Sequence, residues 1–228
     1  MIARTSLLTL LATAILLAGC GSRSSSSSSS SASASSSSAS ASSSRASAGG
    51  STGAQVGFEG VAIQLGREVA PASSTGTGTI HGIHCGASER LEYHIHAHLA
   101  VYAAGQPRAL PGGIGIPGST VQPTAQGPVA AGGQCIYWLH THAPDGIIHV
   151  ESPTHRVYTL GDFFDEWHQP LTPGQIGTVA GKISALVDGN PWPGSPRAIP
   201  LNSHAVIQLN VGSPAAPLRP LSWSGLGL

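Results

Sequence analysis

The sequence predicts an α+β fold that is mainly antiparallel β: a sandwich-like sheet with one short helix after a hairpin. Three observations support this prediction. Apolar and polar residues alternate in several short segments, a tight turn joins two of these segments, and only one segment has helical periodicity. Strands are followed by a helix and then by further strands, which favours packed layers over a regularly alternating parallel fold.

The first half of the globular region contains two predicted strands. In residues 59–69, every second residue from Val61 is apolar, which favours a first strand. Residues 91–101 alternate more strongly, so this strand should present histidines on one face and apolar side chains on the other. The Gly- and Pro-rich residues 111–133 should form a long irregular loop.

A hairpin is predicted around the Ala-Pro-Asp-Gly sequence that joins residues 136–142 to residues 147–152. With the tightest pairing across this turn, His140 lies opposite His149 on the same face. A bulge at Gly146 would shift the register by one residue and move His149 to the other face. The sequence leaves both registers open.

Residues 160–168 form the predicted helix. Thr159 can cap it, Asp162 lies in its first turn, and Pro170 ends it. Its apolar positions fall on one face and are Leu160, Phe163, Phe164 and Trp167. Two further strands are expected at residues 182–187 and 205–211.

The N-terminal segment predicts export. Arg4 precedes an apolar run that ends in Leu-Ala-Gly-Cys, so residues 1–19 resemble a bacterial lipoprotein signal and Cys20 should carry the lipid. An ordinary signal peptide is the alternative. Residues 20–55, rich in Ser and Ala, should form a flexible linker, and residues 56–228 a single domain. The domain would then be extracytoplasmic, anchored to the cell membrane or to an outer membrane.

Charge and cysteine content restrict the remaining possibilities. Charged residues make up 9% of the chain and the formal net charge is zero, which argues against a nucleic-acid partner. If Cys20 is lipidated, Cys85 and Cys135 remain as a pair, and in an exported protein a disulfide is favoured over two thiolate metal ligands.

Six of the 11 histidines fall in two clusters, within the predicted strands. Neutral imidazole is the commonest protein ligand for transition metals, and side chains two residues apart on a strand point the same way. The clusters therefore predict a metal site, with Cu(II) or zinc as the expected ion. The candidate ligands are His94, His96, His98, His140, His142, His149 and Glu151.

One pair has a local counterpart in known zinc sites. His140 and His142, with a third histidine, resemble the His-x-His plus His site of α-carbonic anhydrases. The third ligand would be His149 or His96. Glu151 could be a fourth ligand, a carboxylate that orients an imidazole, or a general base.

Other histidines and other site types are less favoured. His81 and His84 lie beside Cys85 and could approach the clusters, whereas the remaining histidines read as ordinary surface residues. Met1 is the only methionine, which excludes thioether-rich copper(I) sites and blue-copper sites with a methionine ligand. Neither a cupin pattern nor a His-Glu-x-x-His zinc motif is present.

The stretch from Tyr-His-Ile-His-Ala-His at 93–98 to Tyr-Trp-Leu-His-Thr-His-Ala-Pro-Asp-Gly-Ile-Ile-His-Val-Glu at 137–151 resembles a family of exported bacterial lipoproteins. The resemblance covers about residues 85–170 and implies no particular activity.

These observations lead to three hypotheses. The first is a lipid-anchored, extracytoplasmic metal-binding protein for scavenging, delivery or homeostasis of the metal. The second is a metalloenzyme that uses the same histidines, with Glu151 as acid or base. The third is a structural or partner-binding surface protein whose histidines respond to pH.

Overall fold

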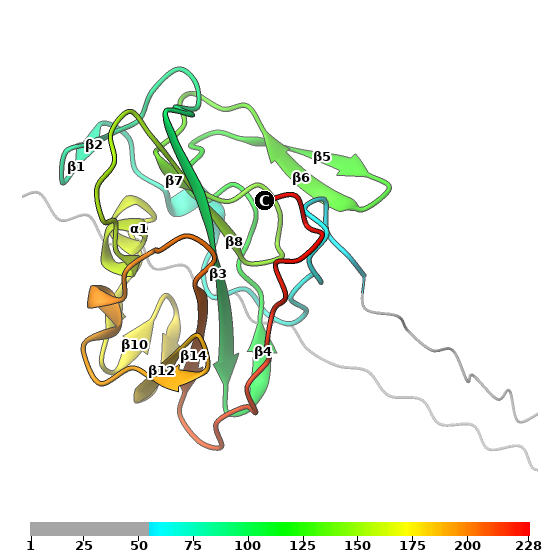
Figure 1. Cartoon of the computed structure of the whole chain (residues 1–228), viewed down its shortest axis with the longest axis vertical. Helices are drawn as coiled ribbons and strands as arrows, with labels where there is room; N and C mark the ends of the chain where they lie inside the picture. The colour runs from blue at the N-terminus through cyan, green and yellow to red at the C-terminus, as the bar shows by residue number, and fades with distance from the viewer. Residues whose placement is uncertain (1–54) are drawn as a thin grey trace, which may run out of the picture. The chain divides into compact units, whose positions relative to one another are not determined.

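A computed structural model describes residues 55–228 of the protein (Figure 1). The predicted signal peptide, the lipidated Cys20 and all but the last residue of the predicted linker lie outside the described residues. Within the described residues, strands predominate and one α-helix is present, so the predicted α+β class is confirmed. No described helix is long and apolar enough to cross a membrane.

The largest sheet is built around one long strand, β3 (Tyr93–Ala103), which crosses the middle of the domain in Figure 1. The sheet has the order β13-β12-β14-β3-β8-β7, and β4 also pairs with β3. Its other strands are β4 (Gln106–Arg108), β7 (Leu139–His140), β8 (Ile147–Ser152), β12 (Ile183–Val187), β13 (Asn190–Pro191) and β14 (Val206–Val211). All of its pairings are antiparallel except that of β14 with β3, which is parallel.

Three small sheets surround this one. Two are hairpins and the third is a meander of three two-residue strands. They consist of β1 (Thr79–Ile80) with β2 (Ile83–His84), of β5 (Thr120–Thr124) with β6 (Gly127–Ala131), and of β9 (Leu171–Thr172), β10 (Gln175–Ile176) and β11 (Val179–Ala180). Two short 3-10 helices lie at Ala72–Ser74 and Pro196–Ala198.

The hydrophobic core lies against one face of the large sheet. The odd-numbered residues of β3, such as Leu99 and Val101, are buried there, together with Ile148 and Val150 of β8. Because residues directly opposite one another in a sheet share a face, the even-numbered histidines of β3 all point the other way. The fold thus separates an apolar face from a histidine face, as the alternation predicts.

Helix α1 (Leu160–Glu166) packs its apolar side into this core. The predicted cap is present: Thr159 Oγ1 accepts a hydrogen bond from the backbone N–H of Asp162, and the Asp162 carboxylate accepts one from the backbone N–H of Thr159. This capping box satisfies two N–H groups that would otherwise lack partners at the helix start.

The histidine face is also covered, which the sequence does not predict. Gln64, in the N-terminal segment, donates a hydrogen bond from Nε2 to the carbonyl oxygen of Leu99 at 2.7 Å. On β14, Gln208 Nε2 donates to the carbonyl oxygen of Ala216 in the C-terminal segment at 3.3 Å. Chain segments from both ends of the domain therefore shield this face from water.

Two predictions about the fold are wrong. Residues 59–69 form no strand and make only single bridges to their neighbours, because a turn at Gly60, which has φ 79°, redirects the chain across the sheet. Residues 111–133 are not wholly irregular, since they contain the β5–β6 hairpin. All five residues of β5 are exposed, so this hairpin has no apolar alternation from which to predict it.

The predicted hairpin and disulfide are both confirmed. His140 pairs with His149, which is the register without a bulge, although β7 is only two residues long. Cys85 and Cys135 form a disulfide with their Cα atoms 5.3 Å apart. Next to it, Gly86 and Ile136 exchange two backbone hydrogen bonds. The entrances to β3 and β7, which carry the two histidine clusters, are thereby joined.

Candidate metal centre

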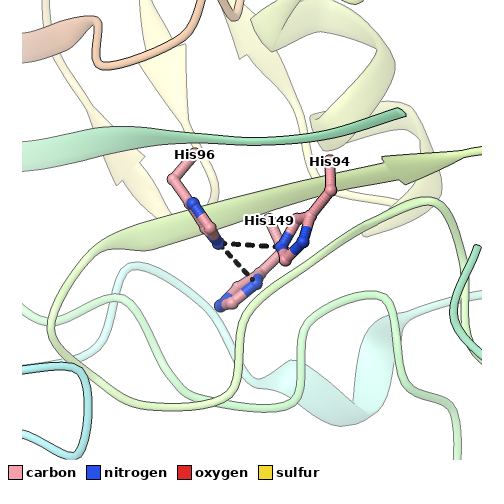
Figure 2. A group of neighbouring side chains, drawn as sticks. All are labelled: His94, His96 and His149. Atoms are coloured by element: carbon pink, nitrogen blue, oxygen red, sulfur yellow. Dashed lines mark hydrogen bonds between the residues drawn. The ribbon is translucent and has the colours of Figure 1, made fainter. Parts of the chain in front are cut away.

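The pairing of β3 with β8 brings three histidines and a glutamate together. His96 lies directly opposite His149, and His94 lies opposite Glu151, so all four side chains leave the same face of the sheet. Figure 2 shows the rings of His94, His96 and His149 with nitrogens turned toward one another. His96, His149 and Glu151 are buried, and only His94 is substantially exposed.

Four potential ligand atoms form a closed ring in this cluster. His94 Nε2 lies 3.0 Å from His96 Nε2, which lies 3.2 Å from His149 Nδ1. Glu151 Oε1 completes the ring, 3.2 Å from His149 Nδ1 and 3.1 Å from His94 Nε2. We call these four residues the first cluster.

Hydrogen bonds alone satisfy this ring poorly. An ionised carboxylate can only accept, so His94 Nε2 and His149 Nδ1 must supply the hydrogens for their contacts with Glu151. His96 Nε2 must then accept from the same two N–H groups. Two hydrogens therefore serve four contacts.

A single metal ion would satisfy all four atoms at once. With metal–ligand distances of about 2.0–2.1 Å, neighbouring ligand atoms lie about 3.3 Å apart around a tetrahedral ion and about 2.9 Å apart around a square-planar ion. The observed spacings of 3.0–3.2 Å fall between these two values.

His149 is held between two carboxylates. Its Nδ1 faces Glu151, and its Nε2 makes a very short contact with Glu59 Oε1. Burial by itself would lower the pKa of His149, but the hydrogen bonds to Glu151 and Glu59 raise it to about 9. Burial would likewise raise the pKa of Glu59, but its hydrogen bond to His149 lowers that pKa overall. In the metal-free protein His149 is therefore a cation, and a metal must displace its Nδ1 proton.

His96 is already prepared to act as a ligand. Burial lowers its pKa to about 4, and the neighbouring His149 and His94 act in the same direction. Its imidazole is therefore neutral at pH 7 and keeps a lone pair for a metal.

A second group of histidines comes from the hairpin. His140 is fully buried, and its Nδ1 donates a hydrogen bond to the carbonyl oxygen of Tyr137 at 2.9 Å. His142 Nδ1 donates to the carbonyl oxygen of Ala130 at 3.0 Å. A hydrogen bond at Nδ1 fixes the tautomer and leaves the lone pair on Nε2, as is usual for metal-bound histidines.

The free nitrogen of His140 has no hydrogen-bond partner among the described residues. Complete burial lowers the pKa of His140 well below its usual value, and the nearby His149 and His142 lower it further. A buried lone pair without a donor costs free energy unless something else occupies it, and a metal ion would do so.

Three groups of side chains could hold a metal ion, since the ligand atoms in each lie within 4.8 Å of one another. They are His94, His96 and His149; His140, His142 and His149; and Glu89, His140 and Glu151. The groups overlap, so the histidines of β3 and those of the hairpin belong to one region.

One predicted ligand lies apart. His98 shares the histidine face but faces Ile147 rather than a histidine across the β3–β8 pair, and it belongs to none of the three groups among the described residues. Its Nε2 donates a hydrogen bond to the carbonyl oxygen of Asp145 at 3.2 Å, and burial lowers its pKa to about 4. We therefore place His98 outside the candidate centre.

His81 and His84 do not join the cluster either. His84 Nδ1 contacts Thr79 Oγ1 at 2.9 Å, while His81 lies beside the carboxylates of Asp162 and Asp165.

Three acidic residues near the histidines are not predicted from the sequence. Glu59 contacts His149, and Glu89 Oε1 lies 3.5 Å from His142 Nε2. Asp145 lies in the hairpin turn, where burial and the neighbouring Glu59 raise its pKa to about 8. Glu59 and Glu89 come from segments without a metal-ligand pattern, so only the tertiary fold reveals them.

Comparisons of the chain with protein-family models, with curated proteins and with solved structures found no match. The argument for function therefore depends on the geometry of the site.

Proposed function

We propose that the protein binds a divalent transition metal, Cu(II) or zinc, outside the cytoplasm, and serves in scavenging, delivery or homeostasis of that metal. The observation that carries the proposal is the closed ring of four ligand atoms formed by His94, His96, His149 and Glu151. The lipoprotein-like N-terminus, with lipid on Cys20, supports a location at a membrane surface.

The ligand set fits these two metals. Imidazole nitrogen suits both Cu(II) and zinc, and a single carboxylate oxygen is compatible with each. The second carboxylate, Glu59, can accept the Nε2–H of His149 and so fix the ring while Nδ1 binds the ion. Three ligands come from buried side chains on paired strands, which holds them rigidly.

Metal content of the purified full-length protein tests this proposal. After chelator treatment, reloading with Zn²⁺ or Cu²⁺ and desalting, we expect at least one ion per chain. The double variant His94→Ala/His96→Ala should lose the ion of the first cluster. As a matched control, His84→Ala/His155→Ala removes two exposed histidines outside the three groups and should bind as the wild type does. A wild-type chain that stays free of both metals would overturn the proposal.

One observation favours a second function, catalysis at the bound metal. A cavity of about 180 Å³ reaches His142 and has mostly apolar walls, formed in part by Pro111, Val121 and Pro144. A small molecule there would lie beside an ion bound by the hairpin histidines. This function requires an open coordination position.

Co²⁺ substitution tests for that position. If it exists, azide added to the Co²⁺ form should change the visible d–d spectrum. An unchanged spectrum at saturating azide would argue for a closed binding site and against catalysis.

A further inference from the structure

Glu151 presents its two oxygens to two different sets of ligands. Oε1 lies 3.1 Å from His94 Nε2 and 3.2 Å from His149 Nδ1, inside the first cluster. Oε2 is buried, has no hydrogen-bond partner among the described residues, and lies 3.9 Å from His140 Nε2. The carboxylate therefore stands between the histidines of β3 and those of the hairpin.

The atoms on the far side of Glu151 form a second set of ligands. His140 Nε2 and His142 Nε2 carry free lone pairs, because each ring donates its Nδ1–H to a backbone carbonyl. Glu89 Oε1 lies 3.5 Å from His142 Nε2, and Glu89, His140 and Glu151 offer atoms within 4.8 Å of one another. This second cluster thus holds two imidazoles and two carboxylates.

The two clusters share no nitrogen. The first uses His94, His96 and His149, and the second uses His140 and His142. One ion cannot take all five histidines and both oxygens of Glu151, because Cu(II) and zinc sites in proteins hold four or five ligands. A single ion in the first cluster would leave His140 Nε2 and Glu151 Oε2 buried without a partner.

We infer that the protein holds two metal ions side by side, bridged by the Glu151 carboxylate with one oxygen on each ion. The inference rests on the proposed function, since it places a second divalent transition ion next to the first. Two-metal sites in proteins have ions about 3.5–4 Å apart. Glu89 and Glu151 supply the negative charge that partly offsets the second ion.

Copper titration of the full-length protein tests the inference. Wild-type protein should bind two Cu²⁺ per chain. At one equivalent, electron paramagnetic resonance should show an isolated Cu(II) signal. At two equivalents that signal should weaken, because neighbouring bridged ions couple magnetically.

Variants separate the two positions. His140→Ala/His142→Ala should bind one Cu²⁺ per chain and keep an isolated signal at every loading, while the His84→Ala/His155→Ala control should bind two. Glu151→Gln should bind without the coupling, because an amide is a poor bridge between two ions. These results would support the pair.

The two proposals fail in different ways. If wild-type protein binds one ion per chain, the second position is overturned and the proposed function stands. If it binds none, both are overturned. Two ions with no loss of the isolated signal would overturn the bridge. The wild-type stoichiometry decides these points even if a variant does not fold.

Discussion

The two faces of β3 are buried to a similar degree but have opposite chemistry. On one face, Leu99 and Val101 are at most 1% exposed, and on the other, His96 and His98 are 6–7% exposed. The apolar face packs against α1 and the remaining core, where close packing supplies the stabilisation. The histidine face is covered by polar segments from both ends of the domain and retains buried atoms without partners.

This difference shows that burial at the histidine face does not by itself serve stability. Buried polar groups in native proteins nearly always have hydrogen-bond partners. Here His140 Nε2 and Glu151 Oε2 have none among the described residues. The fold bears this cost at the place where metal-ligating side chains from β3, β7 and β8 meet, and a bound ion would remove it.

Two buried glutamates make the same contrast. Glu151 lies among three histidines, whereas Glu166 of α1 lies in the apolar core near Tyr137. Complete burial raises the pKa of Glu166 well above its usual value, so its carboxyl group is neutral at pH 7. A carboxyl group buried without a donor gives up its charge, and only the one beside imidazoles is placed to bind a cation.

The largest predicted effect is on the apolar face. Leu99→Ala should lower the free energy of unfolding by about 2–5 kcal/mol, because it removes a fully buried side chain and leaves a cavity. Metal stoichiometry should not change, since Leu99 points away from the histidines. Urea unfolding with and without Zn²⁺ measures both quantities. Loss of the metal from a folded Leu99→Ala protein would show that the two faces are not independent.

The histidine face should respond in the opposite way. At free Zn²⁺ of 100 times the dissociation constant, the wild type should gain about 2.7 kcal/mol of stability. His96→Leu should lose most of that gain, yet its metal-free stability should change by only about 1 kcal/mol, because Glu151 Oε1 still accepts from His94 and His149. Thermal unfolding with and without Zn²⁺ tests this. If His96→Leu unfolds as readily as Leu99→Ala without metal, the histidine face is part of the structural core.

Local patterns carry part of this fold, and tertiary contacts carry the rest. Strand β3, the β7–β8 register and the cap of α1 are predictable because alternation, the turn sequence and the Thr159–Asp162 pair are all local signals. The same alternation misleads at residues 59–69, where it cannot distinguish a paired strand from a segment that lies across a sheet.

The candidate site divides in the same way. Period-two spacing predicts which histidines share a face, and the hairpin register brings His149 opposite His140. Spacing alone also includes His98, which the fold occupies with the carbonyl oxygen of Asp145. Glu59 and Glu89 approach from segments that are distant in sequence from the histidine they contact or carry no pattern of their own, so no local signal marks them.

The electrostatics of the histidine face predict a pH dependence for the metal-free protein. His149 and Asp145 have folded-state pKa values raised to about 9 and about 8, so the folded state binds these protons more tightly than the unfolded state. Their contribution is present at low pH and lost as pH rises through those values. From pH 7 to pH 8 the free energy of unfolding should fall by about 1–2 kcal/mol. Chemical unfolding at several pH values measures it.

The sign should reverse when metal is bound. Protons compete with the ion for His149 Nδ1, so stabilisation by metal grows as pH rises. His149→Gln should weaken the fall in metal-free stability and also reduce metal binding. A metal-free protein that became more stable between pH 7 and pH 8 would contradict the charge assigned to His149.

The smallest predicted effect lies at the start of α1, on the apolar side of the sheet. Thr159→Ala removes the side chain that accepts from the Asp162 backbone N–H, and should cost about 1 kcal/mol. Thr159→Ser keeps the hydroxyl and should restore most of this. Because α1 packs on the face opposite the histidines, the loss should be the same with and without Zn²⁺. A cost that differs between the two states would mean that the ion also acts on the core, so that the two faces of β3 are coupled through the strand.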